Sequence, residues 1–404
     1  MTKKELVKKI AVAAFATGLT FGAAHAQEEV KLTNNEGSEY QFNVVKSLDA
    51  TAVKNQGRSG TCWSFSTLSF FETEMERMGK EKIDLSPMFV VRHTYPDKAE
   101  KYIRMHGNLN FGAGGAFHDV AYVIKNYGIV PFDVYTGLDE NAKRYDHMEM
   151  DDVLKGIVDA VVKQKQPSTY WRNAVEGTLD SYVGALPEKF EYNGKEYTPE
   201  SFAKEVGLNM DDYVSITSYT HHPFYNQFAL EVPDNWMGLQ SYNLPLDEMM
   251  QVMDNALMNG YSIAWGADVS EKGFNYRAGL AIMPEDANTL SVQGKDSKYF
   301  NDAGAQKYGE AFIHPVKEKE ITQEMRQEAF DNFQTTDDHG MHIVGIAKDQ
   351  KGTKYYIVKN SWGKSNYCDG YFYASEAYTK YKTMNFMVHR DAIPKELKKK
   401  LGIK

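Results

Sequence analysis

Residues 55–65 have the sequence NQGRSGTCWSF, a glycine-containing loop that leads into a predicted helix beginning at Cys62. Apolar residues recur after the cysteine in steps of three and four as far as Met78, and Gly79 ends the pattern, which predicts a helix. The sulfur would lie at the positive end of that helix, where the dipole favours the nucleophilic thiolate. The segment therefore predicts a reactive thiol if Cys62 is exposed; a buried cysteine acting as a small apolar residue is the alternative.

The same segment resembles the region around the nucleophile of papain-type cysteine proteases. Gln56 precedes Cys62 by six residues and Trp63 follows it, while Thr61 stands where papain has serine. The resemblance implies an α+β fold of two lobes, one helical and one an antiparallel β-barrel-like lobe, with large insertions. It also implies that Cys62 is the catalytic nucleophile and that the Gln56 side-chain amide and the Cys62 backbone N–H form an oxyanion hole.

Two histidines in the segment DDHGMHIVGI, residues 337–346, are candidates for the base that takes the thiol proton. In an extended strand, His339 and His342 point to opposite faces, so only one can meet Cys62. His339 is followed by a small residue and an apolar one ahead of a Val-Gly step, as in papain-like enzymes, and we predict that it is the base. A metal site at this pair is disfavoured, because neither helical i,i+4 spacing nor a third ligand is visible.

A predicted strand over residues 354–359 ends at Asn360, and the sequence Asn-Ser-Trp-Gly that begins there resembles the third catalytic position of the family. The Asn360 amide oxygen would accept a hydrogen bond from His339 and fix the tautomer of the ring. Trp362 would shield that contact from water, and the resemblance also makes it a predicted substrate-binding residue. The chain order of cysteine, histidine and asparagine favours this catalytic interpretation over a simple strand end.

Gly114 and Gly115 belong to the run FGAGGAFHD, residues 111–119, where missing side chains would let a substrate main chain approach the backbone. Together with the sequence YGIVP at residues 127–131, this run resembles the bleomycin hydrolase and aminopeptidase C branch of papain-like enzymes. In papain-like enzymes the matching glycines hold the substrate main chain, so both are predicted substrate-binding residues, with an ordinary glycine turn as the alternative. A phosphate-binding loop is disfavoured because no Gly-Lys-Ser/Thr follows.

The resemblance covers about residues 48–392 and implies a peptidase that hydrolyses peptide bonds through a thioester without a cofactor. For this branch it further implies an aminopeptidase that forms a homo-oligomer, namely a hexamer. In that branch the chain's own C-terminal carboxylate lies in the cleft and binds the free amine of the peptide. The basic tail, residues 393–404, is longer than the usual ending, so a threaded tail, a trimmed tail and a surface helix all stay open. An endopeptidase of the same family and a non-catalytic peptide-binding protein on the same fold are the alternative functions.

Residues 1–26 resemble a secretory signal peptide, with lysines, a short apolar run and an Ala-His-Ala ending. The run is too short for a membrane span, so we expect a periplasmic or extracellular protein without a membrane anchor. Removing these residues, which carry four lysines and one glutamate, changes the net charge from −9 to about −12. Nucleic acid is therefore not an expected partner.

Only two cysteines are present, Cys62 and Cys368, and we expect both to be unpaired because a disulfide would remove the nucleophile. Cys368 would then have a structural role. The expected organisation is a signal peptide (1–26), an N-terminal extension (27–47), a helical lobe with the nucleophile (48–140), a helical and loop insertion (141–240), a β lobe with histidine and asparagine (241–392, with an insertion at about 284–335) and the tail (393–404).

Overall fold

Helix α2 spans Cys62–Arg77 in the computed structural model, which describes residues 32–139, 142–297 and 305–404. The helix begins at the cysteine, as its periodicity predicts, and Gly79 follows with φ of +75°, a conformation that glycine adopts without strain. All side chains from Trp63 to Met75 are buried. The signal peptide predicted for residues 1–26 lies outside the described residues.

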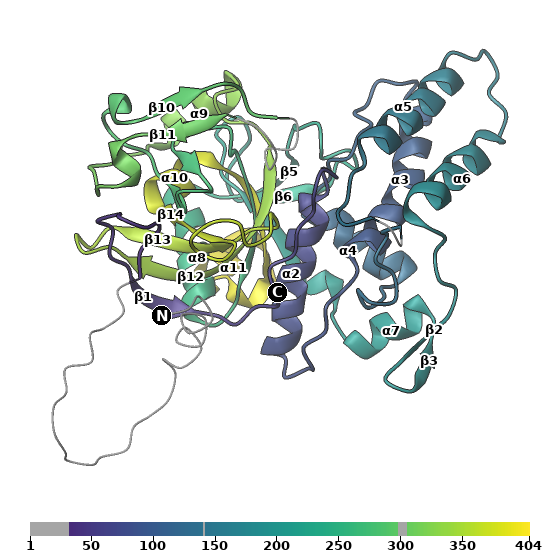
Figure 1. Ribbon diagram of the computed structural model, residues 1–404, viewed down its shortest axis with the longest axis horizontal. Helices are drawn as coiled ribbons and strands as arrows, with labels where there is room; N and C mark the ends of the chain where they lie inside the picture. The colour runs from purple at the N-terminus through teal and green to yellow at the C-terminus, as the bar shows by residue number, and fades with distance from the viewer. Residues whose placement is uncertain (1–31, 140–141, 298–304) are drawn as a thin grey trace. The chain divides into compact units, whose positions relative to one another are not determined.

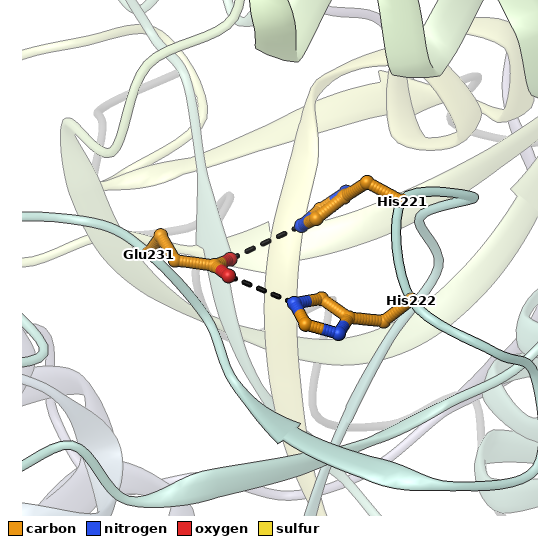
Figure 2. A group of neighbouring side chains, drawn as sticks. All are labelled: His221, His222 and Glu231. Carbon is orange, nitrogen blue, oxygen red and sulfur yellow. Dashed lines mark hydrogen bonds and ion pairs between the residues drawn. The ribbon is translucent and has the colours of Figure 1, made fainter.

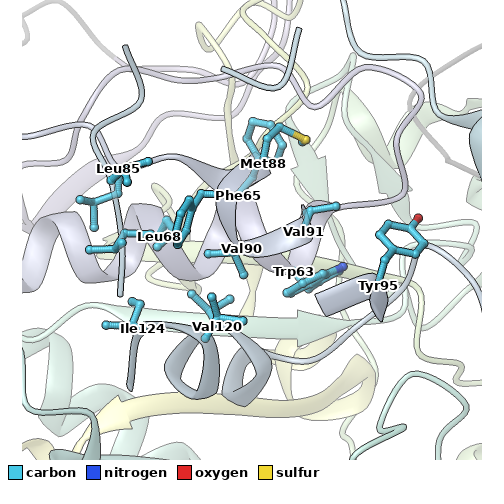
Figure 3. Close-up of a cluster of buried hydrophobic side chains, with 14 of the residues drawn as sticks. Trp63, Phe65, Leu68, Leu85, Met88, Val90, Val91, Tyr95, Val120 and Ile124 are labelled. Carbon is cyan, nitrogen blue, oxygen red and sulfur yellow. The ribbon is translucent and has the colours of Figure 1, made fainter. Parts of the chain in front are cut away.

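Helices and their connections make up the region that follows, and they bury one cluster of apolar side chains with α2 (Figure 3). The Ser86 hydroxyl accepts a hydrogen bond from Phe89 N and Pro87 occupies the first turn, so the second helix begins where the sequence supplies an N-cap. These helices are α3 (Pro87–Arg104), α4 (Phe117–Tyr127), α5 (Met148–Val162), α6 (Trp171–Val183) and α7 (Pro199–Val206).

The rest of the chain is organised around an eleven-stranded mixed sheet. Its order is β5-β6-β4-β15-β7-β12-β13-β14-β9-β8, and β1 pairs with β12. The strands are β1 (Asn43–Ser47), β4 (Tyr213–Thr217), β5 (Gln227–Ala229), β6 (Gln240–Asn243), β7 (Ile263–Ala267), β8 (Phe274–Asn275), β9 (Leu280–Ala281), β12 (His339–Lys348), β13 (Lys354–Lys359), β14 (Tyr371–Ser375) and β15 (Thr383–His389).

This sheet is open: within the described ranges no pairing joins β5 to β8, the two ends of the order. The end strands have only two or three residues, which offer few hydrogen bonds for closure. The expected β-barrel-like lobe is thus a curved set of strands without full closure. Helix α2 packs against β12 and β7 on one side and against α3 and α4 on the other, so it lies where the helical part meets the sheet (Figure 1).

The region expected as an insertion at 141–240 divides between the two parts. Helices α5 to α7 share the apolar cluster of α2, and a small hairpin of β2 (Phe190–Tyr192) and β3 (Lys195–Tyr197) lies between α6 and α7. Strands β4, β5 and β6 instead extend the large sheet. Strand β1 falls within the expected extension, and its pairing with β12 gives that segment a place in the sheet.

A second apolar cluster lies on the sheet and is covered by helices α8 (Leu246–Met258), α10 (Glu376–Lys382) and α11 (Lys395–Leu401). The methionine-rich α8 belongs to it, as its helical spacing predicts. Leu397 and Leu401 of α11 are also buried there. The tail therefore ends in a helix whose apolar face is packed against the protein.

The region expected as an insertion, about 284–335, carries the hairpin of β10 (Ser291–Gln293) and β11 (Gln306–Tyr308), followed by α9 (Gln323–Asp331). Arg326 of α9 is fully buried and donates hydrogen bonds to the carbonyl oxygens of Ser218 at 2.8 Å and Lys380 at 3.1 Å. Glu318 accepts hydrogen bonds from Met283 N and from the Ser375 hydroxyl. Buried polar contacts thus attach the insertion to the sheet region.

Both cysteines are unpaired, as the sequence analysis predicts. Cys368 contacts the carbonyl oxygen of Asn34 at 3.3 Å and packs against a small apolar cluster near the N-terminal segment. No helix in the described ranges has the length and apolar character needed to span a membrane.

Candidate active site

Cys62 and His339 line the same cavity. Each is the first residue of its element, α2 for the cysteine and β12 for the histidine. Gly340, which follows the histidine, lies against the backbone of Trp63, which follows the cysteine, so the two segments are in direct contact. The structure therefore places the predicted nucleophile and the predicted base together.

Gly340 allows this close approach because it has no side chain. A Cβ atom at this position would come within 2.8 Å of Ser66 Oγ and 3.2 Å of Trp63 Cα, both on α2. The second of these atoms is helix backbone, which cannot move independently. The small residue after the histidine is thus required by the packing of β12 against α2.

Asn360 makes the expected contact with the histidine. His339 Nε2 donates to Asn360 Oδ1 at 2.7 Å, and Ser361 N donates to the same oxygen at 2.8 Å. With its proton on Nε2, the imidazole has Nδ1 available as a base. The Trp362 ring lies 4.5 Å from the His339 ring, centroid to centroid, and covers this buried contact.

Gln56 joins this group through Ser361. The Ser361 hydroxyl donates to Gln56 Oε1 at 2.6 Å, and Gln56 N donates to Ser361 O at 2.8 Å. Because the side-chain oxygen is occupied, the amide nitrogen is the end left to donate to a substrate. Gln56 is 1% exposed, so this orientation is fixed by surrounding protein.

His342 lies on the opposite face of β12. Its Nδ1 atom is 2.9 Å from Ser69 Oγ, and Lys359 Nζ donates to the same hydroxyl at 2.7 Å. The Ser69 hydroxyl therefore donates to the imidazole. His342 is committed to this buried group away from Cys62, as the alternation of a strand predicts.

The two predicted substrate-binding glycines differ in their surroundings. Gly115 lines the cavity, and a Cβ atom there would come within 2.8 Å of the Trp63 ring. A Cβ atom at Gly114 would collide with the carboxylate of Asp234, 1.9 Å from Oδ2. The Gly114 backbone is thus covered by an acidic side chain, which the sequence analysis did not predict.

Cys62 is partly exposed and His339 is buried, and loss of contact with water favours the neutral form of each. This desolvation raises the pKa of the Cys62 thiol to about 12, and the charges of Asp234 and Asp337 act in the same direction. Burial also lowers the pKa of His339 to about 4, against the opposing hydrogen bond to Asn360. The helix end alone would favour a thiolate, but in this cavity desolvation has the larger effect.

Asp234 and Asp337 line the cavity with the catalytic pair, and sequence reasoning missed both. Asp337 stands two residues before His339, and its place next to the predicted base is a signal in the sequence that marks it as a cavity residue. Asp234 comes from a loop more than a hundred residues away in sequence, and no local pattern connects it with Cys62.

One group in the described part of the chain has the geometry to hold a metal ion: His221, His222 and Glu231 (Figure 2). The Nε2 atoms of His221 and His222 lie 3.1 and 2.8 Å from the two Glu231 carboxylate oxygens. Two imidazoles and a carboxylate would suit zinc. Each imidazole already has Glu231 as its partner, however, so the group is satisfied without an ion and ties two segments of the chain together.

Comparison with known families gives two matches. A family described as "Peptidase C1-like family" matches residues 187–314 and 316–403, and "Papain family cysteine protease" matches residues 40–206. The first covers more than half of the chain. Between them the two matches include all four predicted catalytic residues.

Curated relatives match over almost their whole length. Aminopeptidase C of Lactobacillus delbrueckii subsp. lactis is 24% identical, with 95% of this chain and 90% of the relative covered. Aminopeptidase C of Streptococcus thermophilus is also 24% identical, with 91% and 87% covered. Among solved structures, PepW from Lactobacillus rhamnosis HN001 has a TM-score of 0.66 at 21% identity, with 89% and 84% covered. This likeness confirms the expected two-lobed α+β fold.

Proposed function

Because this chain belongs to the Peptidase C1-like family of papain-like cysteine peptidases, we propose that it is an aminopeptidase in which Cys62 forms a thioester with the substrate. Its similarity to Aminopeptidase C proteins over nearly their full length supports removal of residues from a free N-terminus. The observation that carries the proposal is one cavity containing Cys62 and His339, with Asn360 hydrogen-bonded to the histidine.

The reaction begins with neutral partners. His339 Nδ1 takes the Cys62 proton as the sulfur attacks the carbonyl carbon, and the tetrahedral oxyanion forms. The negative charge passes from the sulfur to the carbonyl oxygen as the S–C bond forms, and the imidazolium charge develops nearby. The attraction between the two charges offsets part of the cost of forming ions in a buried site. The Gln56 amide and the Cys62 backbone N–H at the helix start are the proposed donors to the oxyanion.

Collapse of the tetrahedral intermediate breaks the C–N bond. His339 gives its proton to the departing amine, and the acyl group remains on sulfur as a thioester. A water molecule then attacks this thioester while His339 takes its proton, which releases the carboxylic acid and restores the thiol. Asn360 keeps the ring aligned through both halves of the reaction.

A pair of reporters tests the proposal. One carries a single aminoacyl group with a free amine, and the other carries the same group with an acetylated amine. We expect faster cleavage of the free-amine reporter and loss of activity after one equivalent of an iodoacetamide-type reagent has labelled Cys62. Equal or faster cleavage of the acetylated reporter would favour the alternative endopeptidase, and a labelled protein without any activity would favour a peptide-binding protein.

We also propose that the protein is exported and forms a homo-oligomer. The signal-like sequence of residues 1–26 supports export, and the resemblance to the bleomycin hydrolase branch supports a hexamer. N-terminal sequencing of the protein from its native compartment tests the first, with Gln27 expected as the new N-terminus. Light scattering during size-exclusion chromatography tests the second.

A further inference from the structure

The catalytic cavity is acidic on one side. Asp234 and Asp337 line it with Cys62 and His339, and both carboxylates are close enough for their charges to act on the sulfur. Placing anionic groups beside a nucleophile that must itself become an anion has a cost for catalysis. A positively charged group on the substrate would remove that cost.

Asp234 is held in place against the substrate-binding glycines. Its carboxylate lies against Gly114, where a Cβ atom would collide with it. Asn110 Nδ2 donates to Asp234 Oδ1 at 3.1 Å. The next residues of the loop are also fixed, since Trp236 Nε1 donates to Asp119 Oδ2 at 2.7 Å. The carboxylate therefore occupies the path that a longer substrate chain would follow along Gly114.

Asp337 has no hydrogen bond or ion pair within the ranges that the structure describes. Burial raises the pKa of this carboxyl, and the charges of Asp234 and Asp338 raise it further. Burial raises the pKa of Asp234 as well, against the opposing positive charge of Lys98. An ammonium group beside both carboxylates would relieve the remaining repulsion and give Asp337 a partner.

The C-terminal tail is held elsewhere. Leu397 and Leu401 are buried against the sheet region, and Lys400 Nζ pairs with Glu248 at 2.6 Å. None of the described residues of the tail lines the cavity. The cavity's own carboxylates are thus the anions available to a substrate amine.

Building on the proposed aminopeptidase function, we propose that Asp234 binds the free α-ammonium group of the peptide and so limits cleavage to the N-terminal residue. Asp337 adds a second, weaker interaction with the same ammonium group. Asp234 acts in two ways. Its charge attracts the ammonium group, and its position over Gly114 closes the cleft beyond the first residue. Peptides that are acylated at the N-terminus lose the ion pair and meet the carboxylate sterically.

The test compares Asp234→Asn and Asp337→Asn with the parent on the free-amine and acetylated reporters. For Asp234→Asn we expect kcat/KM on the free-amine reporter to fall about 10- to 100-fold, mainly through KM, because a charge-assisted hydrogen bond is lost. Activity on the acetylated reporter should stay the same or rise. Asp337→Asn should lower the ratio of kcat/KM on the free-amine reporter to kcat/KM on the acetylated reporter, but by less than Asp234→Asn. Asp247→Asn, whose side chain is 93% exposed on α8, is the matched control and should leave the ratio unchanged.

Binding to the inactive Cys62→Ala protein gives a second measurement that does not depend on turnover. Calorimetry with a dipeptide and its N-acetyl form should show selectivity for the free amine, and the selectivity should disappear when Asp234→Asn is added. If the parent prefers the free amine but both Asp variants keep that preference, the assignment of Asp234 is wrong and the proposed function stands. If the parent cleaves neither reporter, the proposed function fails. In that case, binding that is selective for the free amine and needs Asp234 still supports the amine site. Binding without selectivity for the free amine overturns the site.

Discussion

At the scale of single residues, burial decides the protonation of the catalytic pair. The pKa of Cys62 is raised to about 12 and that of His339 is lowered to about 4, so both are neutral over the whole physiological range. The hydrogen bond to Asn360 fixes the orientation of the imidazole, and the Trp362 ring shields it from water. The ion pair is therefore expected to form during attack rather than before it.

This leads to a prediction for the pH dependence. His339 must be neutral to accept the thiol proton, and because its pKa is lowered it stays neutral until the pH falls to about 4. We expect the acid limb of kcat/KM near pH 4, well below the usual range of histidine. Initial rates on the free-amine reporter between pH 3 and 7 measure it, and an acid limb near pH 6.5 would contradict this view of the site.

A second prediction concerns Gln56. Its side-chain oxygen is occupied by Ser361, so its amide nitrogen is the donor end. Gln56→Ala should lower kcat by about 10²–10³-fold through loss of one oxyanion donor. Gln56→Glu removes the donor while keeping the shape and should be as inactive. Circular dichroism melting checks that both variants fold, and near-parent turnover in either would rule out this role.

At the scale of elements, the site depends on the contact between α2 and β12. Neither element carries both catalytic groups, and Gly340 permits them to approach. Strand β12 is held on both sides by β7 and β13, and β1 pairs with its far end. The histidine is thus presented by a strand in the middle of the sheet.

Gly340→Val tests this contact. The new side chain would push against the Trp63 backbone of α2 and separate His339 from Cys62, so kcat/KM should fall by about 10²-fold or more. Gly156→Val in α5 is the control, because a Cβ atom at that position meets open space apart from the backbone of its own helix. Rates and melting temperatures of both variants are compared. Full activity in Gly340→Val would mean that the contact is not required.

The attachment of the insertion gives a prediction about stability. Burial raises the pKa of Glu318 from 4.5, its ordinary value, to about 7 in the folded protein. Between these two pH values the folded protein keeps the proton, whereas the unfolded chain has lost it. The Glu318 contribution to stability must therefore fall as the pH rises from 4.5 to 7. Glu318→Gln should be more stable relative to the parent at pH 8 than at pH 5, by on the order of 2 kcal/mol.

Urea unfolding at both pH values measures this difference. Glu320→Gln is the control, since Glu320 is exposed and only two residues away. A Glu318→Gln effect that is equal at pH 5 and pH 8 would show that the carboxyl ionises normally in the folded protein.

At the scale of the whole molecule, the C-terminal tail stabilises the fold and leaves the cleft open. Helix α11 buries Leu397 and Leu401 against the sheet region. Deleting residues 395–404 should therefore destabilise the protein by about 3–5 kcal/mol through the loss of these side chains. The preference for the free-amine reporter should be unchanged in the protein that remains folded.

A shorter deletion of residues 402–404 moves the terminal carboxylate while keeping α11. This variant should melt near the parent temperature and keep the same ratio of free-amine to acetylated cleavage. A large fall in that ratio would show that the chain's end, and not Asp234, provides the amine-binding charge.

The sequence by itself determined the local parts of this protein. Periodicity placed α2, and strand alternation separated His339 from His342, because each of these depends on neighbours along the chain. Resemblance to papain-like enzymes supplied the fold class and the set of Cys62, His339, Asn360 and Gln56. These residues lie in short segments whose order alone is informative.

Only the tertiary structure decided the rest. It placed the carboxylate of Asp234 over Gly114, made β4 to β6 part of the large sheet and packed the basic tail as a helix. It also reversed the expected effect on the Cys62 thiol, since burial outweighs the helix end. Desolvation, steric approach and long-range charge depend on atoms that are close in space and far apart in sequence, and no local pattern contains them.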